Sequence, residues 1–520
     1  MPQKQISRQQ AQKADEAALK ARFDEATAVH RQGKVIEAER IYTDILRQRP
    51  EHFDALHRLG IIAAQTQRTQ RAVELFRKAI ALNERVASVH RNLGHGLLEL
   101  GMPCDALLSY ERAIALDPSD AESNNGCGLA LHELQRFDES IKCYDRAIAL
   151  NPKFADAYYH RGLVLQHLKR FHESLECYER AIALKPDFVE AYSNCGGVLR
   201  HLERPAEALA SYDRAIALKP ENAEGYLNRG NALRELGRLN EALANFDKAI
   251  AIKPDFAEAY SNRGNVLRKL KRFDEAFISF ERSIALKPDS AEVYTNRGNA
   301  LLDLNRPDEA FISFEKSISL KADSAEVYIN RGNALQELDR ISEALASFDK
   351  AIALKSDLAS AYWNRALTLL RIGDFDQGWK EYEWRWKVKA SWVKPREFLQ
   401  PRWRGEEPLE GQTIVLHAEQ GCGDTIQFVR YVPLVAALGA EVILEVQPDL
   451  KMLLRSVKGV DKVIGRREEL PPFDWYCPLL SLPLAFKTRI ENIPAATPYL
   501  AASPEHVAAW KERLPKSQLP

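Results

Sequence analysis

The sequence has no long hydrophobic run and no apolar leader. Its 520 residues contain no stretch that approaches the roughly 20 consecutive apolar residues needed to span a bilayer. The opening MPQKQISRQQAQKADE is polar and lacks the apolar centre of a secretory signal. We therefore expect a soluble, cytoplasmic protein without a membrane span.

Net charge and paired cysteines are also missing. The 73 Lys and Arg residues balance 73 Asp and Glu residues, so no electrostatic attraction favours nucleic acid as a partner. The seven cysteines include no Cys-x-x-Cys pair. Cys127 and Cys195 share one place in the repeat described next, and Cys143 and Cys177 share another. We interpret the cysteines as reduced packing residues rather than metal ligands or disulfides, and we expect no metal site.

One sequence pattern repeats through most of the chain, with a period of about 34 residues. Its clearest copy is Ala257 to Pro288, AEAYSNRGNVLRKLKRFDEAFISFERSIALKP. A fixed period of this length indicates a repeat architecture. One glycine returns in nine successive copies, at Gly60, Gly94, Gly128, Gly162, Gly196, Gly230, Gly264, Gly298 and Gly332.

Each copy has the pattern of two amphipathic helices. In the clearest copy, Ala257 to about Leu270 and Phe273 to about Leu286 carry apolar or small residues at helical spacing, so the two faces are expected to pack together. Glycine costs roughly 1 kcal/mol inside a helix, so its recurrence predicts a close crossing, opposite the small residue Ala276. Prolines end the second helix of several copies, at Pro118, Pro152, Pro186, Pro220, Pro254 and Pro288.

The order Tyr, Gly, Leu, Ala, Phe or Tyr, Ala and Pro within one period resembles the tetratricopeptide repeat. The resemblance covers Leu19 to about Trp392. In the outermost copies Ala26 and Ala366 replace the glycine, so these units are expected to act partly as caps. The units are expected to begin near Leu19, Phe53, Ala87, Ala121, Ala155, Val189, Ala223, Ala257, Ala291, Ala325 and Ala359.

Two columns of asparagine follow the repeat. They occupy the sixth place of the unit and the place three residues later, which lie on one face of the first helix. The first column begins at Asn92 and is interrupted at Gly126 and His160, so a groove is expected to be strongest from Asn194 onward. From there the first column is Asn194, Asn228, Asn262, Asn296, Asn330 and Asn364, and the second is Asn231, Asn265, Asn299 and Asn333.

These amides allow two interpretations. An amide both donates and accepts hydrogen bonds, so a column of amides can hold an extended peptide by its backbone. In the tetratricopeptide family the first helices line a concave surface, and a similar asparagine ladder in O-linked N-acetylglucosamine transferases holds substrate chains. The resemblance thus implies a protein or extended peptide in a concave groove as the partner. Alternatively, duplication of the central units copied their NRGN motif passively.

An arginine column precedes the glycine place of the repeat. The aliphatic stems of these arginines can pack while the guanidinium groups reach water or an acidic neighbour. We favour this structural role over a row of anion-binding groups. The column is Arg161, Arg229, Arg263, Arg297, Arg331 and Arg365.

Aromatic residues gather where the repeat pattern ends. Trp379, Tyr382 and Trp386 would share one face of a continuous helix, which predicts an apolar plug that closes the solenoid and docks the next domain. The alternative is a set of aromatic platforms that stack on sugar rings. The tryptophans of this segment are Trp379, Trp384, Trp386, Trp392 and Trp403.

After Pro408 the pattern changes to strands that alternate with helices, which favours a parallel, Rossmann-like sheet. Strands are expected at 413–418, 441–446 and 462–464. The first is followed by a glycine-rich loop, EQGCGD, and by a helix from Thr425 to about Leu438, and the second by a helix in PDLKMLLRSV. The dinucleotide fingerprint is incomplete, because Ile426 stands at the third glycine position, so nicotinamide and flavin cofactors are not expected.

The segment AEQGCGDTIQFVRYVP resembles the opening of the N-terminal domain of a GT-B glycosyltransferase, closest to the lipopolysaccharide heptosyltransferase type. In that type a Gly-Asp after the first strand supplies an acidic residue proposed to activate the acceptor hydroxyl. The resemblance implies that Asp424 is the catalytic base, beside the glycine-rich loop of Gly421 and Gly423. Asp424 and Gln427 also have the spacing of a capping box at a helix start, which would be a structural role.

Two neighbours of the loop are weaker candidates for the base. They are Glu419 and His417, and His417 lies inside the expected strand, where a packed histidine is the simpler interpretation.

The predicted fold is mainly α, a tetratricopeptide-repeat α-solenoid followed by an incomplete Rossmann-like α/β domain. The expected parts are a polar segment (1–18), about eleven copies of the repeat (19–392), a linker (393–410) and a partial GT-B-like domain (411–520).

The predicted function is a protein- or peptide-binding scaffold with a glycosyltransferase-type domain that lacks its donor-binding half, so the chain as written is expected to be inactive and without a cofactor. The alternative is a functional protein glycosyltransferase, like the O-linked N-acetylglucosamine or heptosyl enzymes, whose repeats present the acceptor. This chain would then be a truncated form, and the nucleotide-sugar donor would need the second domain.

Overall fold

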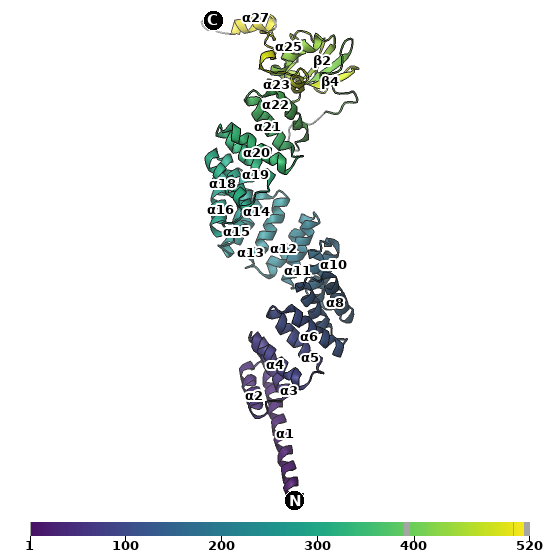
Figure 1. Cartoon of the computed structure of the whole chain (residues 1–520), viewed down its shortest axis with the longest axis vertical. Helices are drawn as coiled ribbons and strands as arrows, with labels where there is room; N and C mark the ends of the chain where they lie inside the picture. Colours follow the sequence, from purple (N-terminus) through teal and green to yellow (C-terminus); the bar gives the residue numbers. More distant parts are fainter. Residues whose placement is uncertain (1, 389–395, 503, 514–520) are drawn as a thin grey trace. The chain divides into compact units, whose positions relative to one another are not determined.

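The computed structural model describes residues 2–388, 396–502 and 504–513. Contacts between Cα atoms divide the chain into two compact units, Met1–Asn262 and Arg263–Pro520. Helix pairs build the first unit and the beginning of the second, and a small sheet follows (Figure 1). The predicted solenoid followed by an α/β region is therefore confirmed. The predicted boundary at residue 392 lies outside the described residues.

The first unit contains seven helix pairs and the start of an eighth. The helices are α1 (Pro2–Arg31), α2 (Val35–Gln48), α3 (Phe53–Gln65), α4 (Thr69–Leu82), α5 (Ala87–Glu99), α6 (Pro103–Leu116), α7 (Ala121–Glu133), α8 (Phe137–Leu150), α9 (Ala155–His167), α10 (Phe171–Leu184), α11 (Val189–His201), α12 (Pro205–Leu218), α13 (Ala223–Glu235) and α14 (Leu239–Ile252).

The division between the units falls inside α15 (Ala257–Lys269). The remaining helices of the solenoid are α16 (Phe273–Leu286), α17 (Ala291–Asp303), α18 (Pro307–Leu320), α19 (Ala325–Glu337), α20 (Ile341–Leu354), α21 (Ala359–Arg371) and α22 (Phe375–Tyr382).

Helix starts agree with the sequence except at the N-terminus. Every unit start predicted from Phe53 to Ala359 is the first residue of a helix. In contrast, α1 begins at Pro2 rather than near Leu19, so residues 2–18 belong to the first helix instead of a separate polar segment. The reason is composition, because Gln, Lys, Arg, Glu and Ala dominate these residues and all are strong helix formers.

The recurring glycine makes room for an aromatic ring. A Cβ on Gly264 would lie 2.6 Å from Cε1 of Phe280, whose side chain is fully buried. Each of the other recurring glycines meets, in the same way, the Phe or Tyr at the equivalent place of the second helix in its own pair. The predicted close crossing at the place of Ala276 is present, since the equivalent Ser140 donates from Oγ to Gly128 O at 2.7 Å. The contact of the glycine with the aromatic ring was not predicted.

The turn between the two helices of each pair contains one residue in the left-handed backbone conformation, with positive φ. Four of these residues are glycines, such as Gly237 at φ 72°, whereas seven are not, such as Lys271 at φ 59°. The turn satisfies carbonyl groups at the end of the first helix, since Gly237 N donates to Arg234 O at 3.1 Å and Arg238 N to Leu233 O at 2.9 Å.

The arginine column joins neighbouring pairs. Arg161 donates from Nε to Asp145 Oδ1 at 2.8 Å on the preceding second helix, and from Nη1 to Cys177 Sγ at 2.9 Å on its own second helix. Arg229, Arg297 and Arg331 make the same two kinds of contact. The structural interpretation of this column is confirmed for these four arginines.

Four parallel strands form the sheet, in the order β3-β2-β1-β4. They are β1 (Thr413–His417), β2 (Glu441–Val446), β3 (Lys462–Gly465) and β4 (Trp475–Pro478). The connecting helices are α23 (Cys422–Phe428), α24 (Val432–Ala436), α25 (Lys451–Leu454), α26 (Leu482–Ala485) and α27 (Pro504–Arg513), with 3₁₀ turns η1 (Glu383–Lys387), η2 (Val429–Tyr431), η3 (Pro448–Leu450), η4 (Leu479–Ser481) and η5 (Ile490–Asn492).

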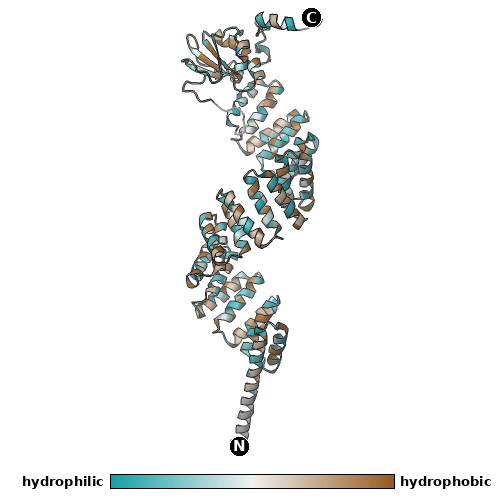
Figure 2. Cartoon of the chain, turned by 180° about the vertical axis from the view of Figure 1, so that it is seen from behind, coloured by the Kyte–Doolittle hydropathy of each residue, from teal (hydrophilic) through white to brown (hydrophobic). Residues whose placement is uncertain are grey.

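The predicted strands are present, but two details differ. The helix after β1 begins at Cys422 instead of Thr425, and it is broken into α23, η2 and α24 rather than running to Leu438. Strand β4 was not predicted, because WYCP is short and follows two prolines. Figure 2 shows the hydrophobic colouring concentrated on the strands, which are buried on both faces, as expected for a parallel sheet.

Among the described residues, no helix combines the length and the apolar composition needed to cross a membrane.

Candidate functional site

The asparagine columns lie on the first helices of their pairs, α11, α13, α15, α17, α19 and α21. Nine of the ten members are half-buried. Asn231 is the exception, since it is only 7% exposed and its Oδ1 is buried without a hydrogen-bond partner. The columns therefore present amide groups at the surface, apart from this one residue.

Neighbouring first helices are bridged at both ends of the first column. Asn194 donates from Nδ2 to the Tyr159 hydroxyl at 3.1 Å, and Asn364 donates to Asn333 Oδ1 at 2.8 Å. Four consecutive members have no side-chain hydrogen bond to any described residue, and all are open to solvent in part: Asn228, Asn262, Asn296 and Asn330.

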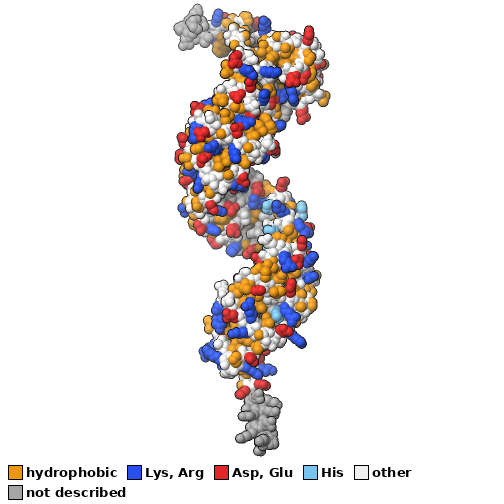
Figure 3. All heavy atoms as spheres, in the orientation of Figure 1, with side chains coloured by type: hydrophobic (Ala, Val, Ile, Leu, Met, Phe, Trp, Pro, Cys, Tyr) orange, Lys and Arg blue, Asp and Glu red, His pale blue; other side chains and the backbone are white. Residues whose placement is uncertain are grey.

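A hollow of about 630 Å³ adjoins Asn194 in the first unit. Its lining comes from three successive pairs and includes Tyr159, Ser193 and Asn222. Lys219 and Lys253 face the same hollow together with Glu190, Glu221 and Glu224, so its charge is mixed. Figure 3 shows the same mixture of acidic and basic side chains over the visible face. A neutral, hydrogen-bonding ligand suits this surface better than a strongly charged one.

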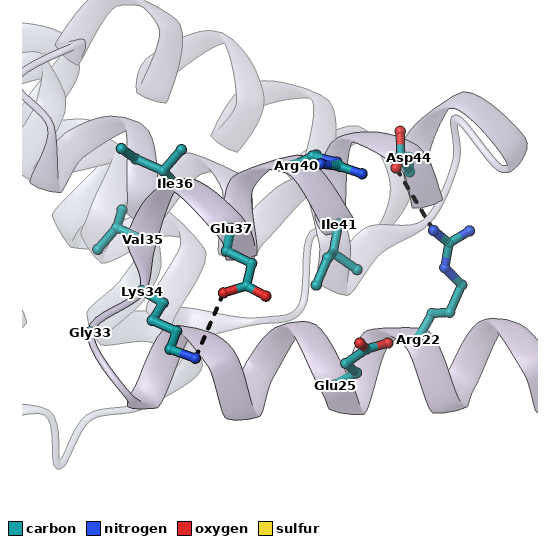
Figure 4. Close-up of a pocket in the computed structure, with 10 residues that line it drawn as sticks. All are labelled: Arg22, Glu25, Gly33, Lys34, Val35, Ile36, Glu37, Arg40, Ile41 and Asp44. Atoms are coloured by element: carbon teal, nitrogen blue, oxygen red, sulfur yellow. Dashed lines mark ion pairs between the residues drawn. The ribbon is translucent and has the colours of Figure 1, made fainter.

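A second hollow, of about 900 Å³, lies between α1 and α2 (Figure 4). Charged residues line it, and two ion pairs border it, Arg22 with Asp44 at 3.7 Å and Lys34 with Glu37 at 3.9 Å. It contains none of the site residues predicted from the sequence, so it does not contribute to the candidate site.

In the α/β region, Asp424 lies in the first turn of α23. The N-cap is Gly421, and Asp424 Oδ2 accepts a hydrogen bond from Gly421 N at 3.2 Å. Only one half of a capping box is present, because Gly421 has no side chain to accept the second hydrogen bond. Asp424 occupies the third helical position rather than the N-cap, so its predicted partner Gln427 has no part in the cap. Asp424 remains half-buried, and a Cβ on the neighbouring Gly423 would meet nothing within 4 Å.

The crevice between β1 and β4 is the usual ligand position of an open parallel sheet, because the chain changes direction there. In this protein Arg385 of η1 fills it. The fully buried guanidinium donates to Glu419 after β1 (Nη2 to Oε2 at 3.0 Å) and to Ser481 Oγ after β4 at 2.7 Å. Its Nη1 also donates to Glu383 at 2.8 Å.

Burial and charge act against each other in this cluster. Burial raises the pKa of Glu419, and the nearby Arg385 only partly offsets that effect. For Glu383, burial also acts to raise the pKa, but the charges of Arg385 and Arg402 prevail and lower it. Glu419 is therefore engaged in a structural ion pair, which removes it as an accessible base.

His417 is a packed histidine, as the simpler interpretation held. It is 5% exposed, and burial lowers the pKa of its imidazole to about 3. Its ring lies 5.7 Å from that of Phe398, between ring centroids. Within the described part of the chain, no group of three or more His, Cys, Asp or Glu residues could hold a metal ion.

The tryptophan-rich segment contacts the α/β region, since Tyr382 belongs to the apolar core of that region and Trp379 packs against it. Three of its indoles are nevertheless not fully buried. Trp379, Trp384 and Trp386 are half-buried, and Trp392 lies outside the described residues. Helix α22 ends at Tyr382 and continues as η1, so Trp386 does not share a helical face with Trp379. Trp384 stacks on Tyr362 of α21, with ring centroids 4.1 Å apart.

Two other residues of this segment are the most deeply buried. Trp403 is 2% exposed and Arg385 is fully buried. Sequence reasoning missed Arg385, because its partners Glu419 and Ser481 stand 34 and 96 residues away and no local pattern connects them.

Models of the tetratricopeptide repeat match residues 23–85, 155–188, 255–323 and 325–358, and a related TPR repeat model matches 128–169, 199–233 and 230–271. Together these matches cover more than half of the chain. A curated relative, protein FlbA of Caulobacter vibrioides, is 26% identical over 169 residues, which are 29% of this chain and 28% of that protein. The chain thus matches less than a third of that relative's length.

Two solved structures match parts of this chain. YrrB, a TPR protein with an unusual peptide-binding site, is 26% identical, with 35% of this chain and 95% of YrrB covered and a TM-score of 0.33. Yeast Tom70 is 17% identical, with 71% and 91% covered and a TM-score of 0.36. On the matched repeats and the helix pairs described above, the chain belongs to the tetratricopeptide-repeat family.

Proposed function

We propose that the solenoid binds an extended segment of another protein by its peptide backbone. The observation that carries this proposal is the set of four consecutive, partly exposed amides without an internal hydrogen bond, at Asn228, Asn262, Asn296 and Asn330. Each can donate to a carbonyl and accept from an N–H of a peptide backbone, through Asn228 and Asn262 in the first unit and through Asn296 and Asn330 in the second. The concave groove expected for this family is the proposed location.

The recognition would depend on amides and not on charge. The guanidinium groups of Arg229, Arg297 and Arg331 are already engaged by acidic and polar residues of the second helices. These three guanidinium groups are therefore not available to pair with charges of a partner. At roughly 0.5–1.5 kcal/mol per hydrogen bond, reduced by the ordering of a flexible peptide, weak to moderate affinity with little sequence preference is expected.

The test is a peptide selected by display from a random library on the full chain. Changing Asn228, Asn262, Asn296 and Asn330 together to Ala should weaken its binding by at least about 30-fold. Thermal unfolding should stay nearly unchanged, because no internal hydrogen bond is lost. N-methylation of the peptide backbone should weaken binding equally, whereas replacing single peptide side chains should not.

A matched control is available on the second helices of the same four units. The exposed residues Lys248, Arg282, Lys316 and Lys350 occupy one equivalent place, and their joint replacement by Ala should leave peptide binding intact. If the asparagine variant binds normally, or if it unfolds several degrees earlier, the amides are not the binding groups.

A second candidate function rests on the α/β region. We infer a glycosyltransferase-type role for it from the parallel order β3-β2-β1-β4 and from a half-buried carboxylate, Asp424, directly after the β1 loop. The repeats would then present the acceptor. Against this stands Arg385, which fills the crevice between β1 and β4.

The second candidate is tested by turnover of UDP-, GDP- and ADP-sugars with the purified chain, compared with a repeats-only control. Turnover that is lost in Asp424→Asn would support it, since Asn can still accept the hydrogen bond from Gly421 but cannot act as a base. No turnover above the control is the outcome we expect for the chain of 520 residues, and it would leave peptide binding as the function.

A further inference from the structure

Two buried cysteines face each other inside the fourth helix pair. Cys127 of α7 and Cys143 of α8 are 4% and 7% exposed, and their sulfur atoms are 3.1 Å apart. That separation is about 1 Å longer than a disulfide bond. Both thiols are free in this structure, and they stand in the same pair of places as Arg161 and Cys177 in the next unit.

At the place where the next unit has Arg161, the fourth unit has the smaller Cys127, which leaves a path from solvent to the two sulfur atoms. In the next unit the side chain of Arg161 extends across to Asp145, the residue that corresponds to Glu111 here. In the fourth unit a hollow of about 370 Å³ remains, lined by both cysteines and Glu111. A small molecule can therefore reach thiols that are otherwise covered by protein.

The surroundings favour a reactive sulfur at Cys143. A hydrogen bond with the Cys127 thiol and the positive charge of Arg146 lower the pKa of Cys143, and they outweigh burial and the carboxylates of Glu139 and Glu111, which act to raise it. Lys142 and Arg136 also line the hollow. The pKa of Cys127 is raised by the same hydrogen bond and by burial, so Cys127 keeps its proton while Cys143 reacts.

We propose that Cys127 and Cys143 form a redox-modifiable dithiol that a small-molecule disulfide oxidises through this hollow. The Cys143 thiolate attacks one sulfur of the small disulfide, which releases one small thiolate and leaves a mixed disulfide on Cys143. Cys127 then loses its proton and attacks Cys143 Sγ, which releases the second small thiol. Two electrons pass from the protein thiols to the small disulfide, and one protein disulfide forms.

The new bond would join α7 to α8 and close a loop of the chain between them. Constraining the unfolded chain in this way raises stability, so the oxidised protein should unfold at a temperature several degrees higher than the reduced protein. Reduction with dithiothreitol should reverse the change.

The experiment uses the full chain, reduced and then incubated with glutathione disulfide before alkylation and tryptic digestion. The expected product is a disulfide between the tryptic peptides 113–136 and 143–146, which hold the two cysteines. In Cys127→Ser the expected product is instead a glutathione adduct on Cys143. Cys195→Ser is the matched control, because Cys195 has the same place in its unit but faces Ser211 at 3.8 Å, and it should not affect the linkage.

The exposed residues Cys104 and Cys422 report whether the oxidant is active. If they acquire glutathione while Cys127 and Cys143 are recovered fully alkylated, the proposal is overturned. Linkage of either cysteine to another partner, in place of the pair, would overturn it as well.

Discussion

The solenoid and the α/β region are stabilised over different distances along the chain. In the solenoid, nine buried aromatic rings pack on the recurring glycine of the preceding helix, and Arg161 of the column reaches partners 16 positions before and after it. In the α/β region, the contacts of Arg385 span 34 residues to Glu419 and 96 to Ser481. A repeat protein is thus assembled from local contacts, whereas the sheet depends on distant ones.

The two regions also differ in how deeply their ion pairs are buried. The column arginines are partly exposed, and their acidic partners, such as Asp145 and Glu281, lie on open surface. Arg385 and Glu419 have side chains that are 0% and 1% exposed. A buried pair pays a large desolvation cost, so removal of one partner leaves an uncompensated charge and is far more damaging than the loss of a surface pair.

The largest effect is expected at this buried pair. Arg385→Ala should lower the free energy of unfolding by about 3–5 kcal/mol, because the Glu419 carboxylate would stay buried without a counterion. Arg297→Ala in the column should cost only about 1 kcal/mol. Urea unfolding followed by circular dichroism and tryptophan fluorescence measures both. The double variant Arg385→Met with Glu419→Leu should recover most of the loss. Equal costs for the two arginines would contradict the contrast between the regions.

The next largest effect concerns two adjacent glycines of α11. A Cβ on Gly196 would lie 2.7 Å from the buried ring of Tyr212, whereas a Cβ on Gly197 would be 3.9 Å from its hydroxyl. Gly196→Ala should therefore lower the free energy of unfolding by about 1–3 kcal/mol through overpacking. Gly197→Ala should raise it by up to about 1 kcal/mol through helix propensity.

Thermal and urea unfolding of the two single variants, at adjacent positions, measure that difference. If both substitutions shift stability in the same direction, the ring contact is not what selects glycine in the repeat.

Acid should weaken the solenoid of the first unit more than that of the second. Burial lowers the pKa of His57 and His160 to about 4, whereas residues 263–388 contain no histidine. The unfolded chain binds protons at these histidines below about pH 6.5, but the folded chain does so only near pH 4. Stability should therefore fall as the pH drops from 6.5 to 4, and stay level above 6.5.

For His160 the loss should be on the order of 1 kcal/mol by pH 5, with allowance for its partial exposure. Hydrogen exchange of backbone amides at pH 7 and pH 5, corrected for the intrinsic rates, resolves the two sets of repeats. His160→Gln should reduce the pH dependence of its own pair. A larger loss of protection in residues 263–388 would refute the assignment to histidine.

The smallest effect is expected at the left-handed turn residue. Lys271→Gly should raise the free energy of unfolding by about 0.5–1 kcal/mol, and Gly237→Ala should lower it by about 1 kcal/mol, because a side chain is strained at positive φ. Both changes lie on exposed turns, so thermal unfolding of the two variants is a direct comparison. If neither substitution changes the free energy of unfolding, positive φ at the turn does not strain a side chain, and the explanation is wrong.

Periodic contacts explain why much of the solenoid could be predicted from the sequence. The helix starts from Phe53 to Ala359 follow from a period that repeats both the pattern and its contacts. The asparagine columns were predicted on one helix face for the same reason. The ring of Phe280 against Gly264 was missed, although Phe280 recurs at a fixed distance, because only the small residue Ala276 was considered as the neighbour of the glycine. The pairing of Cys127 with Cys143 was missed in the same way, since their places in the repeat were noted but not their contact.

The sequence by itself determined the repeat length, the helix pairs, the turns between them and the presence of parallel strands, because each depends on residues within one period or one strand. Only the tertiary structure decided the strand order, the position of Asp424 in the first turn of α23 and the filling of the crevice between β1 and β4 by Arg385. These features arise from residues far apart in the chain that meet in a buried, low-dielectric environment, where one charge requires another. The spacing of residues along the sequence does not show which buried charges will need each other.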